Sequence, residues 1–256
     1  MTCRRSRPEG KPASSVSSAG KWAAIGTAIA ALVGAWQFRD RFADRIIDNL
    51  FRRPGGRVAR WFYRDAKPHQ DAFQETLAAI ELGGEDRLLE VGSGGGTFLA
   101  WALSTGCTAK AVDHSTEMLA LASRRNSSAI ASGRLELHES DAATLPFPDG
   151  EFTAAATINA FFFFDNPHAV LAEVHRTLAP SGRIAIHTLA TAPRPLSGRL
   201  HLYSDEELMR LLEEAGYERI ALRRTGPAAS AQLITARKPA APSSSNGRFR
   251  RSIRSP

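Results

Sequence analysis

The stretch RLLEVGSGGGTFLAWALSTGCTAKAVD, residues 87–113, contains the pattern from which the architecture of this chain follows. It holds a short apolar run at 87–91, a glycine-rich loop at 92–96, a helical segment at 97–104 and a second apolar run at 109–112. A strand, a tight turn, a helix and a second strand in this order form a βαβ unit with parallel strands. The glycines let the backbone turn tightly and approach a ligand at the amino end of the helix.

The same alternation continues on both sides of this unit. Further strands are expected at 134–138, 152–158, 183–188, 217–224 and 230–237, and helices at 68–82, 116–125, 166–178 and 205–215. Strands of about five residues that alternate with helices imply a parallel sheet covered on both faces. We therefore predict an α/β fold with a Rossmann-like, mostly parallel seven-stranded sheet. Its last two strands form an antiparallel hairpin at the C-terminal side, and a helical extension precedes the domain.

The glycine loop fits one ligand-binding pattern better than another. As a dinucleotide fingerprint, GxGxxG, it fails because its third glycine falls on Thr97. As (Asp/Glu)xGxGxG it fits at Glu90, Gly92, Gly94 and Gly96. The alternative for the loop is an ordinary tight turn between a strand and a helix.

Two carboxylates follow later strand ends. Asp113 ends the second strand, where an acidic side chain can accept hydrogen bonds from both hydroxyls of a ribose; its alternative is to cap the next helix. Asp141 lies in the loop after the third strand, where its carboxylate could receive an adenine amino group. The glycine loop and Asp113 together predict an adenosine-containing ligand.

Four blocks of sequence carry a resemblance to a known family. They are LLEVGSGGGTF (88–98), AVDHSTEMLALASRRN (111–126), SDAATLPFPDGEF (140–152) and LAEVHRTLAPSGRIAIHT (171–188). Over residues 68–237 the chain resembles the class I S-adenosylmethionine-dependent methyltransferases, in the branch of ubiquinone and menaquinone biosynthesis. The resemblance implies an enzyme that uses S-adenosyl-L-methionine and methylates a small acceptor.

The resemblance also implies roles for individual residues. The methionine part of the cofactor is expected at Glu90, Gly92, Ser93, Gly94 and Gly96, the ribose at Asp113, the adenosine between Ser115 and Met118, the adenine at Asp141 and Ala142, and the methyl-transfer face at Asn159. Methyl transfer from a sulfonium is an in-line displacement, so alignment is the main requirement. Asn159 and His187 are the candidate catalytic residues. If the acceptor must lose a proton, further candidates for a general base are Tyr63, His69, His201 and Tyr203.

The acceptor is expected to be apolar or aromatic, because four phenylalanines at 161–164 follow the fourth strand. No metal site is expected. Two other functions stay open: an oxidoreductase of the NAD type, and a membrane-associated scaffold that keeps the fold without activity.

Charge divides the chain into an acidic middle and basic ends. The net charge is +7 overall, yet residues 65–236 hold fourteen Lys/Arg against twenty-two Asp/Glu, a net charge of −8. A nucleic-acid-binding domain would carry its basic residues on the folded part, so the pattern argues against that function. We expect disordered basic tails at 1–20 and 238–256 around a methyltransferase domain at 65–237.

The segment 21–64 has two parts. Residues 22–38, WAAIGTAIAALVGAWQF, carry no charge and suit a membrane anchor, a helix packed on the domain or a signal peptide. Residues 39–64 continue as an amphipathic, Arg-rich segment that suits either an anionic membrane surface or a solvated helix that caps the core. A cytosolic cosubstrate favours a cytoplasmic location, either free or held at the cytoplasmic face of a membrane.

Overall fold

The computed structural model describes residues 69–191 and 200–242. The predictions for residues 1–20 and 21–64, and those for residues 243–256 of the basic tail, lie outside the described residues. No helix in the described ranges is long and apolar enough to cross a membrane.

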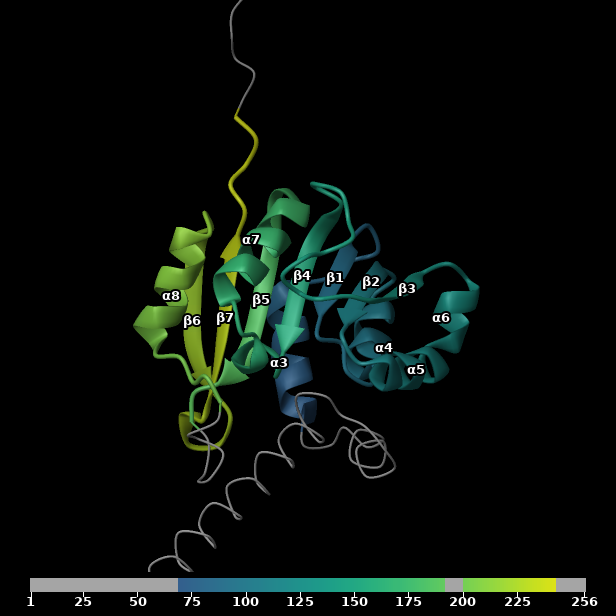
Figure 1. Ribbon diagram of the computed structural model, residues 1–256, viewed down its shortest axis with the longest axis horizontal. Helices are drawn as coiled ribbons and strands as arrows, with labels where there is room; N and C mark the ends of the chain where they lie inside the picture. Colours follow the sequence, from purple (N-terminus) through teal and green to yellow (C-terminus); the bar gives the residue numbers. More distant parts are fainter. Residues whose placement is uncertain (1–68, 192–199, 243–256) are drawn as a thin grey trace, which may run out of the picture. The chain divides into compact units, whose positions relative to one another are not determined.

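Seven strands of the described chain form one sheet (Figure 1). They are β1 (Arg87–Val91), β2 (Thr108–Asp113), β3 (Leu135–Glu139), β4 (Phe152–Ile158), β5 (Leu178–Leu189), β6 (Glu218–Thr225) and β7 (Ala231–Arg237). Their order is β3-β2-β1-β4-β5-β7-β6, in which β1 to β5 run parallel and β7 runs antiparallel to both of its neighbours. The predicted fold class and the antiparallel hairpin are confirmed. The sequence did not reveal that β7 lies between β5 and β6.

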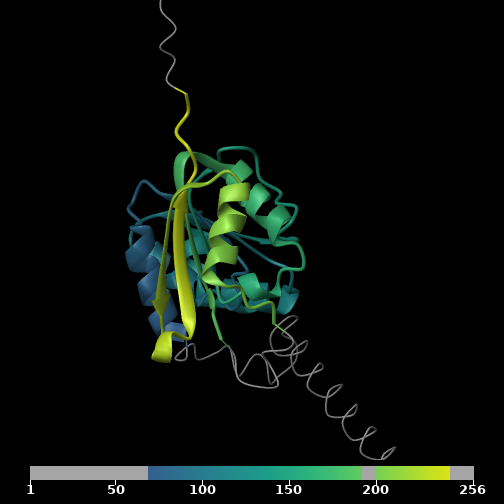
Figure 2. The ribbon, with the colours of Figure 1, turned by 90° about the vertical axis from the view of Figure 1, so that its left-hand side faces the viewer.

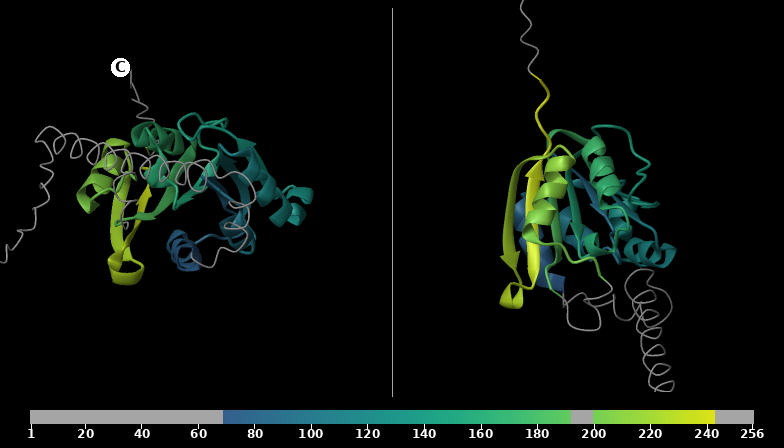
Figure 3. Two further views of the ribbon diagram at one scale, coloured as in Figure 1. Left: turned by 60° about the horizontal axis from the view of Figure 1, so that its bottom comes forward. Right: turned by 60° about the vertical axis from the view of Figure 1, so that its left-hand side comes forward.

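Helices cover both faces of the sheet (Figure 2, Figure 3). They are α3 (Gln70–Ile80), α4 (Thr97–Leu103), α5 (Thr116–Arg125), α6 (Ser127–Ala131), α7 (Pro167–Thr177) and α8 (Asp205–Glu214), with short 3-10 turns η3 (Phe161–Phe163) and η5 (Pro227–Ala229). One buried cluster joins α3 and α4 to the sheet, and a second joins α7 and α8 to its other face.

Strand β1 shows how side-chain alternation positions the site. Leu88 belongs to the cluster under α3 and α4, whereas Leu89 and Val91 belong to the cluster under α7 and α8. Because side chains alternate along a strand, Glu90 lies on the same face as Leu88. The acidic residue of the glycine motif is therefore directed toward the α3 side of the sheet, at the carboxyl end of the strand.

Three features of the described chain were not predicted from the sequence. Helix α6 was not predicted, because its five residues, SSAIA, are too short to show a helical period. Strand β5 begins at Leu178 instead of 183, since Leu178 pairs with Phe152 and the next residues bulge out before Arg183 pairs with Ala154. Contacts of the domain also continue past 237, where Lys238 Nζ donates to the Leu178 carbonyl at 2.7 Å.

Candidate active site

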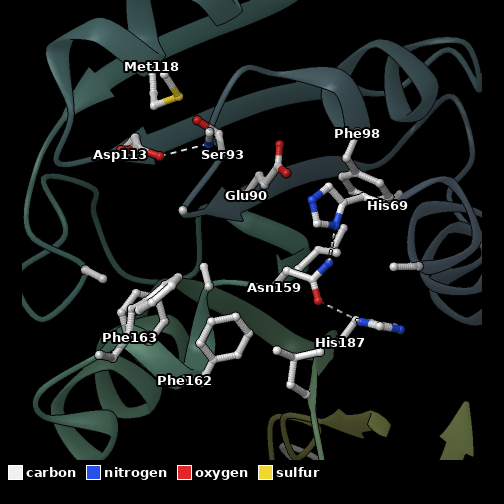
Figure 4. Close-up of a pocket in the computed structure, with 18 of the residues that line it drawn as sticks. His69, Glu90, Ser93, Phe98, Asp113, Met118, Asn159, Phe162, Phe163 and His187 are labelled. Atoms are coloured by element: carbon white, nitrogen blue, oxygen red, sulfur yellow. Dashed lines mark hydrogen bonds between the residues drawn. The ribbon is translucent and has the colours of Figure 1, made fainter. Parts of the chain in front are cut away.

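A cavity of about 960 Å³ opens at the carboxyl ends of β1, β2 and β4 (Figure 4). This is where open parallel sheets bind ligands, and the volume is at the upper end for small-molecule sites. It is lined by ten of the predicted site residues: Glu90, Gly92, Ser93, Gly94, Asp113, Met118, Asp141, Ala142, Asn159 and His187. The fold thus brings together residues from five separate segments of the sequence.

Gly94 is the point at which the loop opens onto the cavity. Its φ of 49° lies in the left-handed region, and a Cβ added there would meet nothing within 4 Å. The backbone can therefore face a ligand directly. Its N–H donates to Oδ2 of Asp113 at 2.8 Å, which ties the loop to the end of β2.

Asp113 is buried, with 8% of its surface exposed, and its second oxygen accepts from the Ser115 N–H at 2.9 Å. Burial raises the pKa of this carboxyl, and the backbone N–H groups of Ser115 and Gly94 oppose that rise by stabilising the charged form. The carboxylate therefore organises the loop by accepting from the backbone N–H groups of Gly94 and Ser115.

Glu90 and Ser93 are buried polar side chains that line the cavity, and each has an oxygen without a hydrogen-bond partner among the described residues. Glu90 is only 3% exposed, and neither its Oε2 nor the Ser93 hydroxyl has a hydrogen-bond partner there. Burial, and then the charge of Asp113, raise the pKa of Glu90 well above its usual value. Such groups are costly unless a ligand or water satisfies them, so they suit the amino-acid part of a bound cofactor.

Gly96 and Ser115 do not line the cavity. Gly96 precedes α4 with φ 71°, and a Cβ there would come within 2.7 Å of Ala122 and Asn126, so this glycine lets α4 approach α5. Ser115 caps α5 by accepting from the Met118 N–H at 3.4 Å. Direct contact of either residue with a cofactor stays a prediction, and the structure gives each of them a local packing or capping role.

Two histidines flank Asn159 across the cavity (Figure 4). The amide nitrogen of Asn159 lies 2.9 Å from Nδ1 of His69, which precedes α3. Its amide oxygen lies 3.3 Å from Nδ1 of His187 on β5. The sequence had offered His69 only as one of several bases, and nothing in it indicated that these three residues meet.

The surroundings of both imidazoles favour their neutral form. Burial lowers the pKa of His69. Burial is also the main cause of the lowered pKa of His187, with Glu75 acting in the opposite sense and His69 and Arg223 lowering it further. Nε2 of His187 lies 3.2 Å from the Thr225 hydroxyl, so both of its nitrogens face protein groups. His187 therefore has no free lone pair that could take a proton from a methyl acceptor in the cavity.

The phenylalanine run divides between core and cavity. Phe162, Phe163 and Phe164 line the cavity, whereas Phe161 is fully buried and packs against Tyr203 with ring centroids 5.2 Å apart. Three of the four phenylalanines therefore give the cavity an apolar wall, and Phe161 belongs to the core. Tyr203, one of the candidate bases, is buried and does not line the cavity either.

The lining of the cavity is strongly acidic. Its described lining includes no Lys or Arg, and it contains six acidic residues: Asp71, Glu75, Glu90, Asp113, Asp141 and Asp165. A lining of this kind favours cationic ligands and disfavours anionic ones. No group of three or more potential metal ligands occurs within 69–191 and 200–242.

The sheet order, the glycine loop and the acidic strand ends are the arrangement that the resemblance to class I methyltransferases predicts. Residues 89–186 match the family described as "Methyltransferase domain".

The chain is similar to a demethylmenaquinone methyltransferase of Clavibacter sepedonicus, at 35% identity over 48% of this chain and 49% of that protein. It is also similar to the O-methyltransferase resE of Aspergillus sclerotiorum, at 28% identity over 56% of this chain and 59% of that protein. Among solved structures, the [4+2]-cyclase SpnF aligns with a TM-score of 0.59 and 22% identity over 67% of this chain and 81% of that one. The chain spans about half the length of the demethylmenaquinone methyltransferases it matches.

Proposed function

We propose that the chain is an S-adenosylmethionine-dependent methyltransferase that acts on a small, apolar or aromatic acceptor by in-line displacement. The observation that carries the proposal is the acidic cavity beside the glycine loop. The methyl donor is a sulfonium cation with an amino group, which suits a lining of six acidic residues without Lys or Arg among the described residues. An NAD-type oxidoreductase would instead have to hold a negatively charged pyrophosphate there.

The cofactor would lie across the glycine loop. Glu90 and Ser93 would meet the methionine part with their unpartnered oxygens, and Gly94 would leave the space for it. Asp113 would accept from the ribose, with Met118 beside the adenosine and Asp141 and Ala142 at the adenine. S-adenosylmethionine supplies an activated methyl group, so the protein needs chiefly to align the two reactants and exclude water.

The acceptor would lie next to the methionine part of the cofactor, where His69, Asn159 and His187 meet. Phe162, Phe163 and Phe164 give the same cavity an apolar wall. The two similar proteins named above are a quinone-type methyltransferase and an O-methyltransferase, which is compatible with a hydroxylated aromatic acceptor. Large anionic acceptors are disfavoured by the acidic lining.

The location of the enzyme is a separate proposal. Residues 39–64 contain eight arginines, and each basic residue near an anionic lipid surface contributes about 1 kcal/mol to binding. We propose that the segment 21–64 rests on or anchors to the cytoplasmic face of a membrane, with the catalytic domain in the cytoplasm.

Calorimetric titration of the full chain with S-adenosylhomocysteine, and separately with NAD, tests the proposed activity. We expect binding of the first and none of the second. Incubation with radiolabelled donor and a quinol-containing lipid extract, followed by mass spectrometry, should then yield a methylated product. Binding of NAD in place of S-adenosylhomocysteine would refute the proposal, and donor binding without any methylated product would favour the inactive scaffold.

A further inference from the structure

The contacts around Asn159 form a hydrogen-bond chain with a defined direction. An amide nitrogen can only donate, so Nδ1 of His69 must be the acceptor of its 2.9 Å contact. The amide oxygen can only accept, so Nδ1 of His187 must carry a proton. A neutral His187 then has a lone pair on Nε2, which accepts from the Thr225 hydroxyl at 3.2 Å.

This direction fixes the tautomer at the cavity end of the chain. A neutral imidazole carries one proton, and Nδ1 of His69 is an acceptor, so the proton of His69 is on Nε2. That nitrogen has no hydrogen-bond partner among the described residues. Figure 4 shows it turned away from Asn159, toward the side of the cavity on which Glu90 lies. The chain therefore presents an N–H donor, and not a base, to the cavity.

The described lining of the cavity holds no Lys or Arg, so no fixed positive charge there would bind an oxygen that carries negative charge. The His69 N–H is a neutral donor that could hydrogen-bond such an oxygen. Phe162 and Phe163 line the same cavity and make part of its wall apolar, and a hydrogen bond is stronger in apolar surroundings.

We propose that His69 is a catalytic residue whose Nε2–H hydrogen-bonds the ionised oxygen of a phenol- or enol-type acceptor, with Asn159 and His187 as positioning residues. This inference rests on the proposed methyltransferase function and adds to it the chemical class of the acceptor.

The transfer step balances without any further reagent. The acceptor hydroxyl gives its proton to solvent, and the resulting oxyanion accepts the hydrogen bond from His69. The electron pair of that oxygen, or of a ring carbon conjugated with it, forms the bond to the methyl carbon. A ring carbon that is methylated then loses its hydrogen as a proton to solvent, and the ring regains its aromatic form. The methyl–sulfur bond breaks, and its electron pair stays on the sulfur, which becomes a neutral thioether.

Binding of 4-nitrophenol tests the donor directly, because only its ionised form absorbs strongly in the visible range. The full chain is saturated with S-adenosylhomocysteine, and absorbance of the bound probe is followed against pH. We expect the wild-type protein to ionise the bound probe about tenfold more readily than His69→Phe, since a hydrogen bond to a charged oxygen is lost. His69→Gln should retain most of the effect, because its amide nitrogen can donate from a similar position.

The variants separate this role from a structural one. His69 makes no side-chain cap to α3, so neither substitution removes a cap, and thermal unfolding should confirm that both variants fold. Asn159→Gly keeps the backbone conformation but removes the amide, and should shift the ionisation of the probe toward that of His69→Phe. Equal ionisation in wild type and His69→Phe, or no binding of the probe to the wild type, would overturn the inference. Failure of S-adenosylhomocysteine to bind would instead overturn the proposed function.

Discussion

Asn159 adopts a left-handed backbone conformation, with φ 54°, at the end of β4. Asparagine tolerates this region better than most residues other than glycine, and non-glycine residues found there are concentrated at functional sites. Its backbone N–H donates to the His187 carbonyl at 2.8 Å, which holds the turn in place. The amide of Asn159 is thus fixed by its backbone before any ligand binds.

Glu90 should make the ligand-free protein less stable as pH rises. Its pKa in the folded protein lies well above the usual 4.5, so the stability that it contributes is present below 4.5 and is lost as pH rises through the folded value. Glu90→Gln cannot ionise and should therefore unfold at a higher temperature than wild type at neutral pH, while the two converge in acid. Thermal unfolding at a series of pH values measures this, and parallel curves for the two proteins would contradict it.

Asp113→Ala should weaken binding of S-adenosylhomocysteine. Loss of two charge-assisted hydrogen bonds costs roughly 2–4 kcal/mol, which is about 30- to 1,000-fold in affinity. The same change leaves the N–H groups of Gly94 and Ser115 without their acceptor, so part of the loss would come from the loop. Asp113→Asn keeps one acceptor oxygen and should give an intermediate affinity by calorimetry. An unchanged affinity in Asp113→Ala would be inconsistent with a ribose contact.

At the scale of elements, two glycines of one loop have different roles. Gly94 leaves space for a ligand, and Gly96, just before α4, leaves space for α5. Gly94→Ala and Gly96→Ala both place a Cβ on a residue with positive φ, so both variants have backbone strain. Only the second forces a contact of 2.7 Å with α5. We expect Gly96→Ala to lower the unfolding temperature more, and Gly94→Val, whose branched side chain enters the cavity, to lower the affinity for S-adenosylhomocysteine more.

Differential scanning calorimetry and ligand titration on the same three variants distinguish the two effects. The interpretation would be wrong if Gly96→Ala were as stable as Gly94→Ala, or if Gly94→Val bound ligand like the wild type.

The sequence predicted the strand and helix pattern well because apolar periodicity and turn residues are local signals. It identified the glycine motif but could not distinguish Gly94, which faces the cavity, from Gly96, which contacts α5. It also named His69, Asn159 and His187 separately. His69 and Asn159 are ninety positions apart in the chain, so only the packing of α3 beside β4 and β5 could reveal their contact.

At the scale of the whole molecule, the basic segment before the domain predicts that binding to a membrane weakens as the salt concentration rises. The full chain should bind vesicles that contain anionic lipid at low salt, and a variant that lacks residues 1–38 should still bind them but dissociate as salt screens its arginines. Full-length protein that resists salt and needs detergent would indicate an inserted anchor. Vesicle flotation measures all of these states, and full-length protein that fails to float at low salt would contradict both membrane proposals.

Strand β7 occupies an interior place in the sheet although it is the last of the seven strands in the sequence. While the protein is being synthesised, β5 therefore emerges with an unpaired edge, and β6 has no neighbour to join until β7 follows. An open edge of this kind can pair with another chain. Completion of the sheet thus awaits residues 231–237, and a nascent polypeptide stalled before them would be an aggregation-prone client for chaperones.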